Sequence, residues 1–253
     1  MRRRPLSVAL LLALVLTLAP ALPARAQAAP ASAPATTRPA HNFARWEKEI
    51  AAFERQDKTN PPPKHCIVFI GSSSIARWKS LPEDFPGLPV VNRGFGGCET
   101  VDVTHFADRI LFPYDPSMIV LRVGGNDIHA GKSADEVFGD FQTFVRTVRD
   151  KLPDAPIVYI GQCPNPARWS ERDANKALNE KVKAYVGANP PLKLKYVEMY
   201  DLSITPDGQP RPELFVADRL HFTPEGNHLM ADRVRPFLPQ SDTPAPQSAT
   251  PRQ

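Results

Sequence analysis

Five short apolar runs with no polar alternation are the feature that most constrains how this chain can fold. A strand exposed on one face alternates between apolar and polar residues, whereas these runs are apolar on both faces. That pattern is typical of parallel strands covered by helices on each side. The expected strands span residues 66–71, 89–92, 117–124, 156–161 and 194–199.

Helical patterns separate these runs. Ser133 and Glu136 form a capping box, Ser170 is expected to open the next helix, and Thr223 caps a last helix with Pro224 at its first position. Alternating strands and helices predict a three-layer α/β/α sandwich around a mostly parallel, five-stranded sheet. An amphipathic helix lying on the sheet is expected before the first strand, from the spacing of Phe43, Trp46, Ile50 and Phe53.

The amino-terminal segment 1–26 has the pattern of a secretory signal peptide. Three arginines precede an apolar stretch over residues 6–19, and small residues follow at Ala24 and Ala26. A membrane-spanning helix needs about 20 apolar residues, so this stretch is too short for an anchor. We therefore expect cleavage near Ala26 and a secreted or periplasmic protein without a stable membrane anchor.

Composition divides the remaining chain. Residues 27–41 and 239–253 are rich in Pro, Ala, Ser and Thr and read as a linker and a disordered tail, which leaves residues 42–238 for one domain. The signal segment holds four arginines and no acidic residue, so 31 basic residues become 27, against 27 acidic ones. A formally neutral mature chain provides no argument for a nucleic-acid partner.

The loops after the expected strands contain the residues suited to chemistry. Ser72, Ser73 and Ser74 follow the first strand, glycines 94, 96 and 97 follow the second, and Asn126 follows the third. Asp218 and His221 precede the last helix. Each has an ordinary structural explanation as a turn former, cap or surface pair. Because parallel strands end at one edge of the sheet, we nevertheless expect these loops to meet there.

Together these residues provide what acyl transfer to serine requires. A serine hydroxyl needs a base, which His221 can supply, and the base needs an orienting carboxylate, which Asp218 can supply. The oxyanion of the tetrahedral intermediate needs donors, such as a glycine N–H, an asparagine amide and the N–H of the serine itself.

The chain resembles the SGNH, or GDSL-type, hydrolases over residues 65–235, with all four sequence blocks in order. This resemblance implies esterase or lipase chemistry on a flavodoxin-like sandwich, with no cofactor or metal. It implies Ser73 as the nucleophile and Asp218 and His221 as orienter and base. Ser73, Gly97 and Asn126 are implied as the oxyanion donors, with Gly94 as the fallback glycine. Trp78 matches the tryptophan often found in the first block.

One position departs from the family pattern. The residue before the nucleophile is usually Asp and here is Ser72, which puts in doubt the hydrogen bonds an acid would make there. A register slip of one residue would make Ser74 the nucleophile.

Other site chemistries fit the sequence less well. The α/β-hydrolase elbow GxSxG is missing its second glycine here. The histidines lack metal-binding spacing. Arg168 or Trp169, after the fourth strand, could contact substrate or simply anchor a loop. Cys66, Cys98 and Cys163 allow at most one disulfide, and their pairing stays open.

Three functions are consistent with the sequence. The first is an exported serine esterase acting on small acyl or acetyl esters, including carbohydrate esters. The second is an O-acyltransferase that uses the same residues. The third is a non-catalytic carbohydrate-binding module on the same fold. The oligomeric state, the acyl chain and the alcohol half of the substrate do not follow from the sequence.

Overall fold

The computed structural model describes residues 40–240. The expected signal segment 1–26, most of the linker and most of the tail lie outside the described residues, so these assignments stay predictions. The described chain from Asn42 onward forms one compact unit. Within residues 40–240, no helix combines the length and the apolar character needed to cross a membrane.

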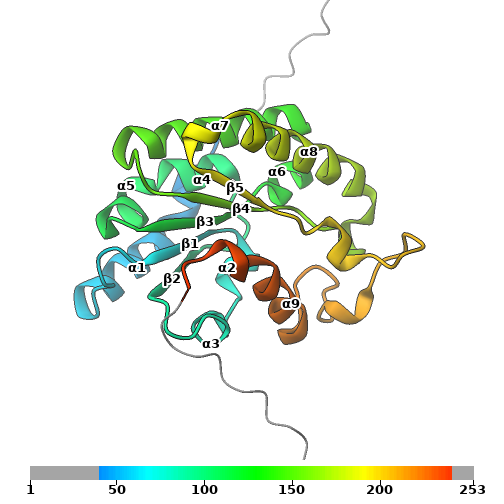
Figure 1. Ribbon diagram of the computed structural model, residues 1–253, viewed down its shortest axis with the longest axis horizontal. Helices are drawn as coiled ribbons and strands as arrows, with labels where there is room; N and C mark the ends of the chain where they lie inside the picture. Colours follow the sequence, from blue (N-terminus) through cyan, green and yellow to red (C-terminus); the bar gives the residue numbers. More distant parts are fainter. Residues whose placement is uncertain (1–39, 241–253) are drawn as a thin grey trace, which may run out of the picture. The chain divides into compact units, whose positions relative to one another are not determined.

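A five-stranded sheet lies at the centre of this unit (Figure 1). Its strand order is β2-β1-β3-β4-β5, and every neighbouring pair is parallel, which confirms the predicted architecture. This order is that of the flavodoxin-like doubly wound fold. The strands are β1 (Ile67–Gly71), β2 (Val90–Gly94), β3 (Met118–Arg122), β4 (Ile157–Ile160) and β5 (Leu194–Val197).

Helices cover both faces of the sheet, in agreement with the apolar character of its strands. Val68, Ile70, Ile119 and Leu121 belong to the core beneath α1, α4, α5, α7 and α8, whereas alternate residues such as Phe69 belong to the core beneath α2, α3 and α9. The helices are α1 (Glu47–Thr59), α2 (Ser73–Ala76), α3 (Leu81–Asp84), α4 (Thr100–His105), α5 (Ala107–Ile110), α6 (Gly125–His129), α7 (Ala134–Lys151), α8 (Arg172–Ala188) and α9 (Pro224–Val234).

Short 3₁₀ turns complete the connections between these elements. They are η1 (Phe43–Trp46), η2 (Phe112–Tyr114), η3 (Pro166–Glu171), η4 (Pro190–Leu192), η5 (Tyr200–Ser203), η6 (Pro212–Leu214) and η7 (Arg235–Phe237). The expected first helix is therefore η1 followed by α1, with Trp46 and Ile50 buried against the sheet.

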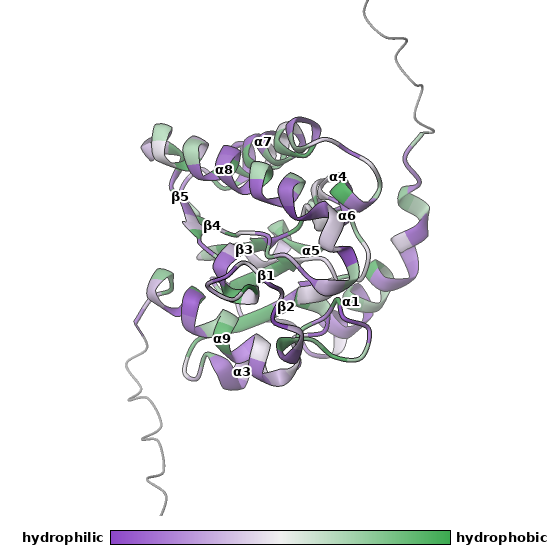
Figure 2. Cartoon of the chain, turned by 90° about the vertical axis from the view of Figure 1, so that its right-hand side faces the viewer, coloured by the Kyte–Doolittle hydropathy of each residue, from purple (hydrophilic) through white to green (hydrophobic). Residues whose placement is uncertain are grey.

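The long helices are amphipathic, as their sequences predict. Hydrophobic and hydrophilic residues are interspersed along α7 and α8 (Figure 2). The Ser133 and Glu136 capping box at the start of α7 is present, and the Thr223 side chain caps α9.

The expectation that Ser170 opens α8 is wrong. Ser170 lies inside η3, and α8 begins two residues later at Arg172. The Asn165 side chain accepts from the Arg168 N–H and so starts the short turn earlier in the chain. The backbone then kinks at Arg168 before it continues into α8.

Asp84, the last residue of α3, links two segments that are far apart in the sequence. This carboxylate is 4% exposed and accepts hydrogen bonds from Trp78 Nε1 (2.6 Å), Ser80 Oγ (2.7 Å) and His228 Nδ1 (2.7 Å). Burial by itself would raise the pKa of Asp84, but these side-chain hydrogen bonds outweigh it and lower that pKa below its ordinary value of 3.8. Asp84 therefore ties the segment after α2 to helix α9.

We predict that Asp84→Asn lowers the free energy of unfolding by about 2 kcal/mol at neutral pH, because it removes a buried, charged acceptor of three hydrogen bonds. The folded-state pKa lies below the unfolded value, so the contribution is fully present above about pH 4 and is lost as the pH falls through the folded value. Urea denaturation at pH 7 and pH 3 measures both effects. The exposed Asp150→Asn is the control, and a stability gap that does not shrink in acid would contradict the assignment.

Candidate active site

The turn after β1 presents the three serines at the end of the sheet. Gly71 has φ +145°, and a Cβ there would lie 2.0 Å from the Arg122 carbonyl oxygen, so only glycine allows β1 and β3 to approach this closely. The Ser72 N–H donates to that same carbonyl, and the Ser72 carbonyl accepts from the N–H groups of Ile75 and Ala76. Backbone groups therefore hold the turn, and α2 begins at Ser73.

Ser73 is the serine whose hydroxyl meets the histidine. Its Oγ lies 2.8 Å from His221 Nε2, although the two residues are 148 positions apart in the sequence. Within residues 40–240, neither the Ser72 nor the Ser74 hydroxyl has a hydrogen bond of this kind to His221. Among the described residues, the Ser72 side chain makes no capping hydrogen bond at the start of α2. The turn is held by backbone hydrogen bonds, so it does not depend on the acid that the family usually has at this position.

A tight turn brings Asp218 and His221 together. The Asp218 Oδ1 accepts from the N–H groups of Leu220 (3.0 Å) and His221 (2.9 Å). Arg219, between Asp218 and Leu220, adopts a left-handed φ of 59°. The Asp218 Oδ2 then lies 2.7 Å from His221 Nδ1. A carboxylate that bonds to backbone N–H groups two and three residues ahead is a common way to close such a turn.

Hydrogen bonds also keep Asp218 ionised. Those from the His221 backbone N–H, the His221 ring and the Leu220 N–H hold the pKa of Asp218 well below its usual range, against the opposing effect of burial. Arg77 Nη1 lies 3.2 Å from Asp218 Oδ2 on the exposed side of the pair. The carboxylate is thus a permanent acceptor for the imidazole.

Asn126 lies in α6, directly after the turn that ends β3. Its Nδ2 donates to the Cys98 carbonyl oxygen (3.0 Å), and its Oδ1 accepts from Arg168 Nη1 (3.1 Å). These two contacts determine which way the amide faces. One Nδ2 hydrogen is used by Cys98, and the other is available to the pocket.

Gly97 has a left-handed φ of 81°, and a Cβ there would lie 3.2 Å from the Trp46 ring. Within residues 40–240, its N–H donates to no protein acceptor. Its neighbour Gly96 lies close to the serine, since a Cβ on Gly96 would be 3.8 Å from the Ser73 Cβ. The fallback glycine, Gly94, is buried against α2.

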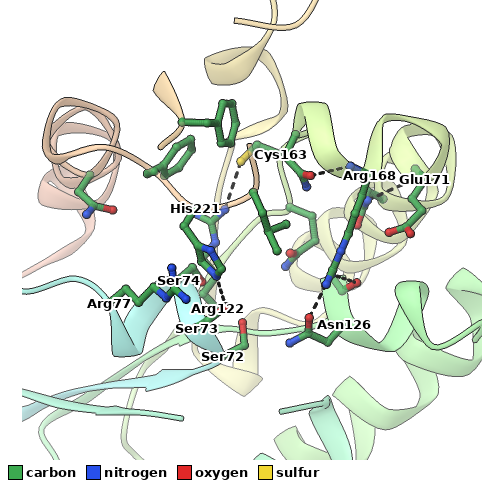
Figure 3. Close-up of a pocket in the computed structure, with 18 residues that line it drawn as sticks. Ser72, Ser73, Ser74, Arg77, Arg122, Asn126, Cys163, Arg168, Glu171 and His221 are labelled. Carbon is green, nitrogen blue, oxygen red and sulfur yellow. Dashed lines mark hydrogen bonds between the residues drawn. The ribbon is translucent and has the colours of Figure 1, made fainter. Parts of the chain in front are cut away.

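A pocket connects these groups (Figure 3). Ser73, Asn126 and His221 line it, whereas Gly97 and Asp218 are not lining residues.

The wall opposite the serine comes from η3 and α8 and includes Arg168 and Glu171. The sequence left open whether Arg168 or Trp169 would reach the site; Arg168 lines the pocket, and half-buried Trp169 does not.

The structure adds residues for which the sequence carried little signal. Asp127 is fully buried and accepts the Thr100 N–H on both oxygens, so it ties α6 to the start of α4. Burial raises the pKa of Asp127, while Lys132 and the Thr100 N–H oppose that rise. Its place directly after Asn126 is a signal that could have indicated this anchoring role. The role of the Cys98 carbonyl has no sequence signal.

Neither a disulfide nor a metal-binding cluster is present among the described residues. The three cysteines are free and buried. Among the described residues, no group of three or more His, Cys, Asp or Glu side chains is arranged to hold a metal ion.

Comparison with known proteins agrees with this fold. The GDSL-like Lipase/Acylhydrolase family model matches residues 70–229. The alpha1 subunit of bovine (Bos taurus) platelet-activating factor acetylhydrolase IB is 30% identical over 173 residues, which cover 64% of this chain and 69% of that protein. Among solved structures, a GDSL-like lipase from Bacteroides thetaiotaomicron is 21% identical with a TM-score of 0.61, covering 78% of this chain and 96% of that one.

An acetylxylan esterase from Geobacillus stearothermophilus shares the fold at lower identity. It is 15% identical with a TM-score of 0.54 and covers 68% of this chain and 94% of that one. The family match spans more than half of this chain and includes the turn after β1 and the start of α9. The chain therefore belongs to the GDSL-like lipase/acylhydrolase family and is a carboxylic ester hydrolase.

Proposed function

We propose that this protein is an exported serine esterase that hydrolyses small acyl or acetyl esters, carbohydrate esters among them, through Ser73, His221 and Asp218. The observation that carries the proposal is the continuous relay from Ser73 Oγ to His221 Nε2 (2.8 Å) and from His221 Nδ1 to Asp218 Oδ2 (2.7 Å). Such a relay lets a neutral imidazole accept the hydroxyl proton while the carboxylate stabilises the imidazolium that forms.

The reaction follows from this geometry. Ser73 Oγ attacks the ester carbonyl as His221 takes its proton, and His221 then donates that proton to the departing alcohol. Water next attacks the acyl-enzyme, with His221 acting first as base and then as acid, so serine and imidazole return to their starting states.

The oxyanion donors in this proposal are the N–H of Ser73, the N–H of Gly97 and the amide of Asn126. The N–H of Ser73 belongs to the first residue of α2, where a helix leaves its N–H groups without intrahelical partners. The Cys98 carbonyl and Arg168 hold the Asn126 amide from two sides, which supports a donor that is already oriented before the oxyanion forms. Arg168 acts here as a positioning residue.

Ser73→Ala should lower kcat for p-nitrophenyl acetate by at least about 10³-fold, because it removes the nucleophile. Ser74→Ala, the neighbouring hydroxyl on the same helix, is the matched control and should retain kcat within about threefold. A serine-directed phosphonate should label Ser73 in the wild type, as read by peptide mass spectrometry. Labelling of Ser72 or Ser74 would overturn the assignment. If the wild type hydrolyses none of the p-nitrophenyl esters, whatever their chain length, esterase activity is excluded.

Asn126→Ala should lower kcat by about 10²- to 10³-fold with a small change in KM, because an oxyanion donor acts mainly in the transition state. Asn189→Ala, at the far end of α8, is the control and should leave both constants unchanged. A variant that raised KM and retained kcat would assign Asn126 to substrate binding instead.

Export is the remaining part of the proposal. Expression of the full chain in a Gram-negative host should yield a mature protein outside the cytoplasm whose first residue is Gln27, because cleavage is expected after Ala26. Amino-terminal sequencing of the fractionated protein measures this. Retention of residues 1–26 on the active protein would contradict it.

A further inference from the structure

Arg122 occupies a position that the proposed reaction does not use. It is the last residue of β3 and pairs with Gly71, two residues before Ser73. Its side chain lies on the sheet face covered by α9, and it lines the same pocket as Ser73 and His221 (Figure 3). A permanently charged group therefore lies beside the nucleophile.

The charge of Arg122 lacks an anionic partner. The residue is 7% exposed, and its guanidinium contacts the sulfur atoms of Met230 and Cys163 and the ring of Phe222. No carboxylate within residues 40–240 forms an ion pair with it. Arginine does not lose its proton in proteins, and sulfur is a weak acceptor. Burial of an uncompensated charge is unfavourable, so this site is incomplete without a negative group.

The rest of the pocket points to the same deficit of negative charge. Arg168 is a second half-buried guanidinium, and its contacts are the neutral oxygen of Asn126 and a backbone carbonyl. Arg77 lies at the rim and pairs with Asp218. Among the described lining residues, Glu171 is the one carboxylate; its Oε1 lies 2.7 Å from His129, and its charge also acts on Arg168. No carboxylate of the described pocket lining remains for Arg122. An ammonium group would be repelled here, whereas an anion would be attracted.

We propose that Arg122 binds an anionic group, a carboxylate or a phosphate, that the natural ester carries close to its scissile carbonyl. This inference rests on the proposed esterase function and adds the substrate class to it. The planar guanidinium matches both oxyacids through paired N–H groups. The anion can belong to the acyl half or to the alcohol half of the ester, since both halves meet at the carbonyl that Ser73 attacks.

Two pairs of esters distinguish these sources. For the acyl half, monomethyl succinate is compared with methyl 4-methylpentanoate, in which an isopropyl group replaces the carboxylate. For the alcohol half, 4-acetoxybenzoate is compared with 4-isopropylphenyl acetate. The quantity measured is the ratio of kcat/KM for the anionic ester to kcat/KM for its neutral partner. Comparing this ratio between variants cancels the intrinsic reactivity of each ester.

Arg122→Met should lower this ratio by about tenfold or more in at least one pair, because the site would lose the group that compensates the substrate charge. Arg122→Lys retains the charge and should restore much of the preference. Arg146→Met removes a charge from the exposed face of α7 and should leave the ratio unchanged. Thermal unfolding of each variant verifies that it folds.

The proposal is overturned if Arg122→Met folds and the ratio stays the same in both pairs. If that variant does not fold, the KM values of the wild-type enzyme provide the test. An anion site is excluded if, in both pairs, the wild-type KM for the anionic ester is no lower than the KM for its neutral partner. Failure of the esterase function gives a different result, since the wild type would then hydrolyse none of the four esters. Hydrolysis of the neutral esters with an unchanged ratio removes the Arg122 proposal alone.

Discussion

The pairing of β1 with strands on both sides is the constraint on which the site depends. Gly71 pairs with Gly94 of β2 and with Arg122 of β3, so three strands end in one row. The loops that follow then start side by side, and Ser73, the Gly96–Gly97 turn and Asn126 come from these three loops. The close contact of Gly71 with the Arg122 carbonyl makes this alignment possible, because any side chain there would force β1 and β3 apart.

A second set of contacts holds the loops to one another. Asn126 bonds to the loop after β2 through Cys98 and to the loop after β4 through Arg168. Asp127 connects the same region to α4 through the Thr100 N–H. These bonds are short-range and directional, so they convert an alignment of strand ends into a defined orientation of one amide. An oriented amide costs no further reorganisation when charge develops on a substrate.

Electrostatics distinguishes the two halves of the pocket. On the His221 side, Asp218 is ionised and saturated by N–H groups. On the Arg122 side, a guanidinium lies among sulfur atoms and an aromatic ring without a compensating carboxylate in the described chain. The negative charge needed by the base is thus built into the protein, whereas the negative charge that Arg122 lacks would arrive with the ligand.

Local patterns were sufficient for much of this molecule. Apolar runs without alternation predicted the parallel sheet, because helices on both faces favour apolar residues at most positions of the central strands. The capping box at Ser133 and the cap at Thr223 depend on neighbours within three residues, and both are present. The prediction that Ser170 opens α8 was wrong because Asn165, five residues earlier, caps a separate short turn. Short-range sequence patterns do not decide between two such competing helix starts.

The sequence by itself determined the fold class, the helix caps at Ser133 and Thr223, and the residue types that could meet at the strand ends, since each depends on local periodicity or on contacts within a few residues. Only the tertiary structure decided which of three adjacent serines faces His221, that Arg168 rather than Trp169 lines the pocket, and that Arg122 has no carboxylate partner among residues 40–240. These facts concern directions and distances between groups up to 148 positions apart in the chain. Such distances depend on how the strands and helices pack, and no short segment of sequence contains that information.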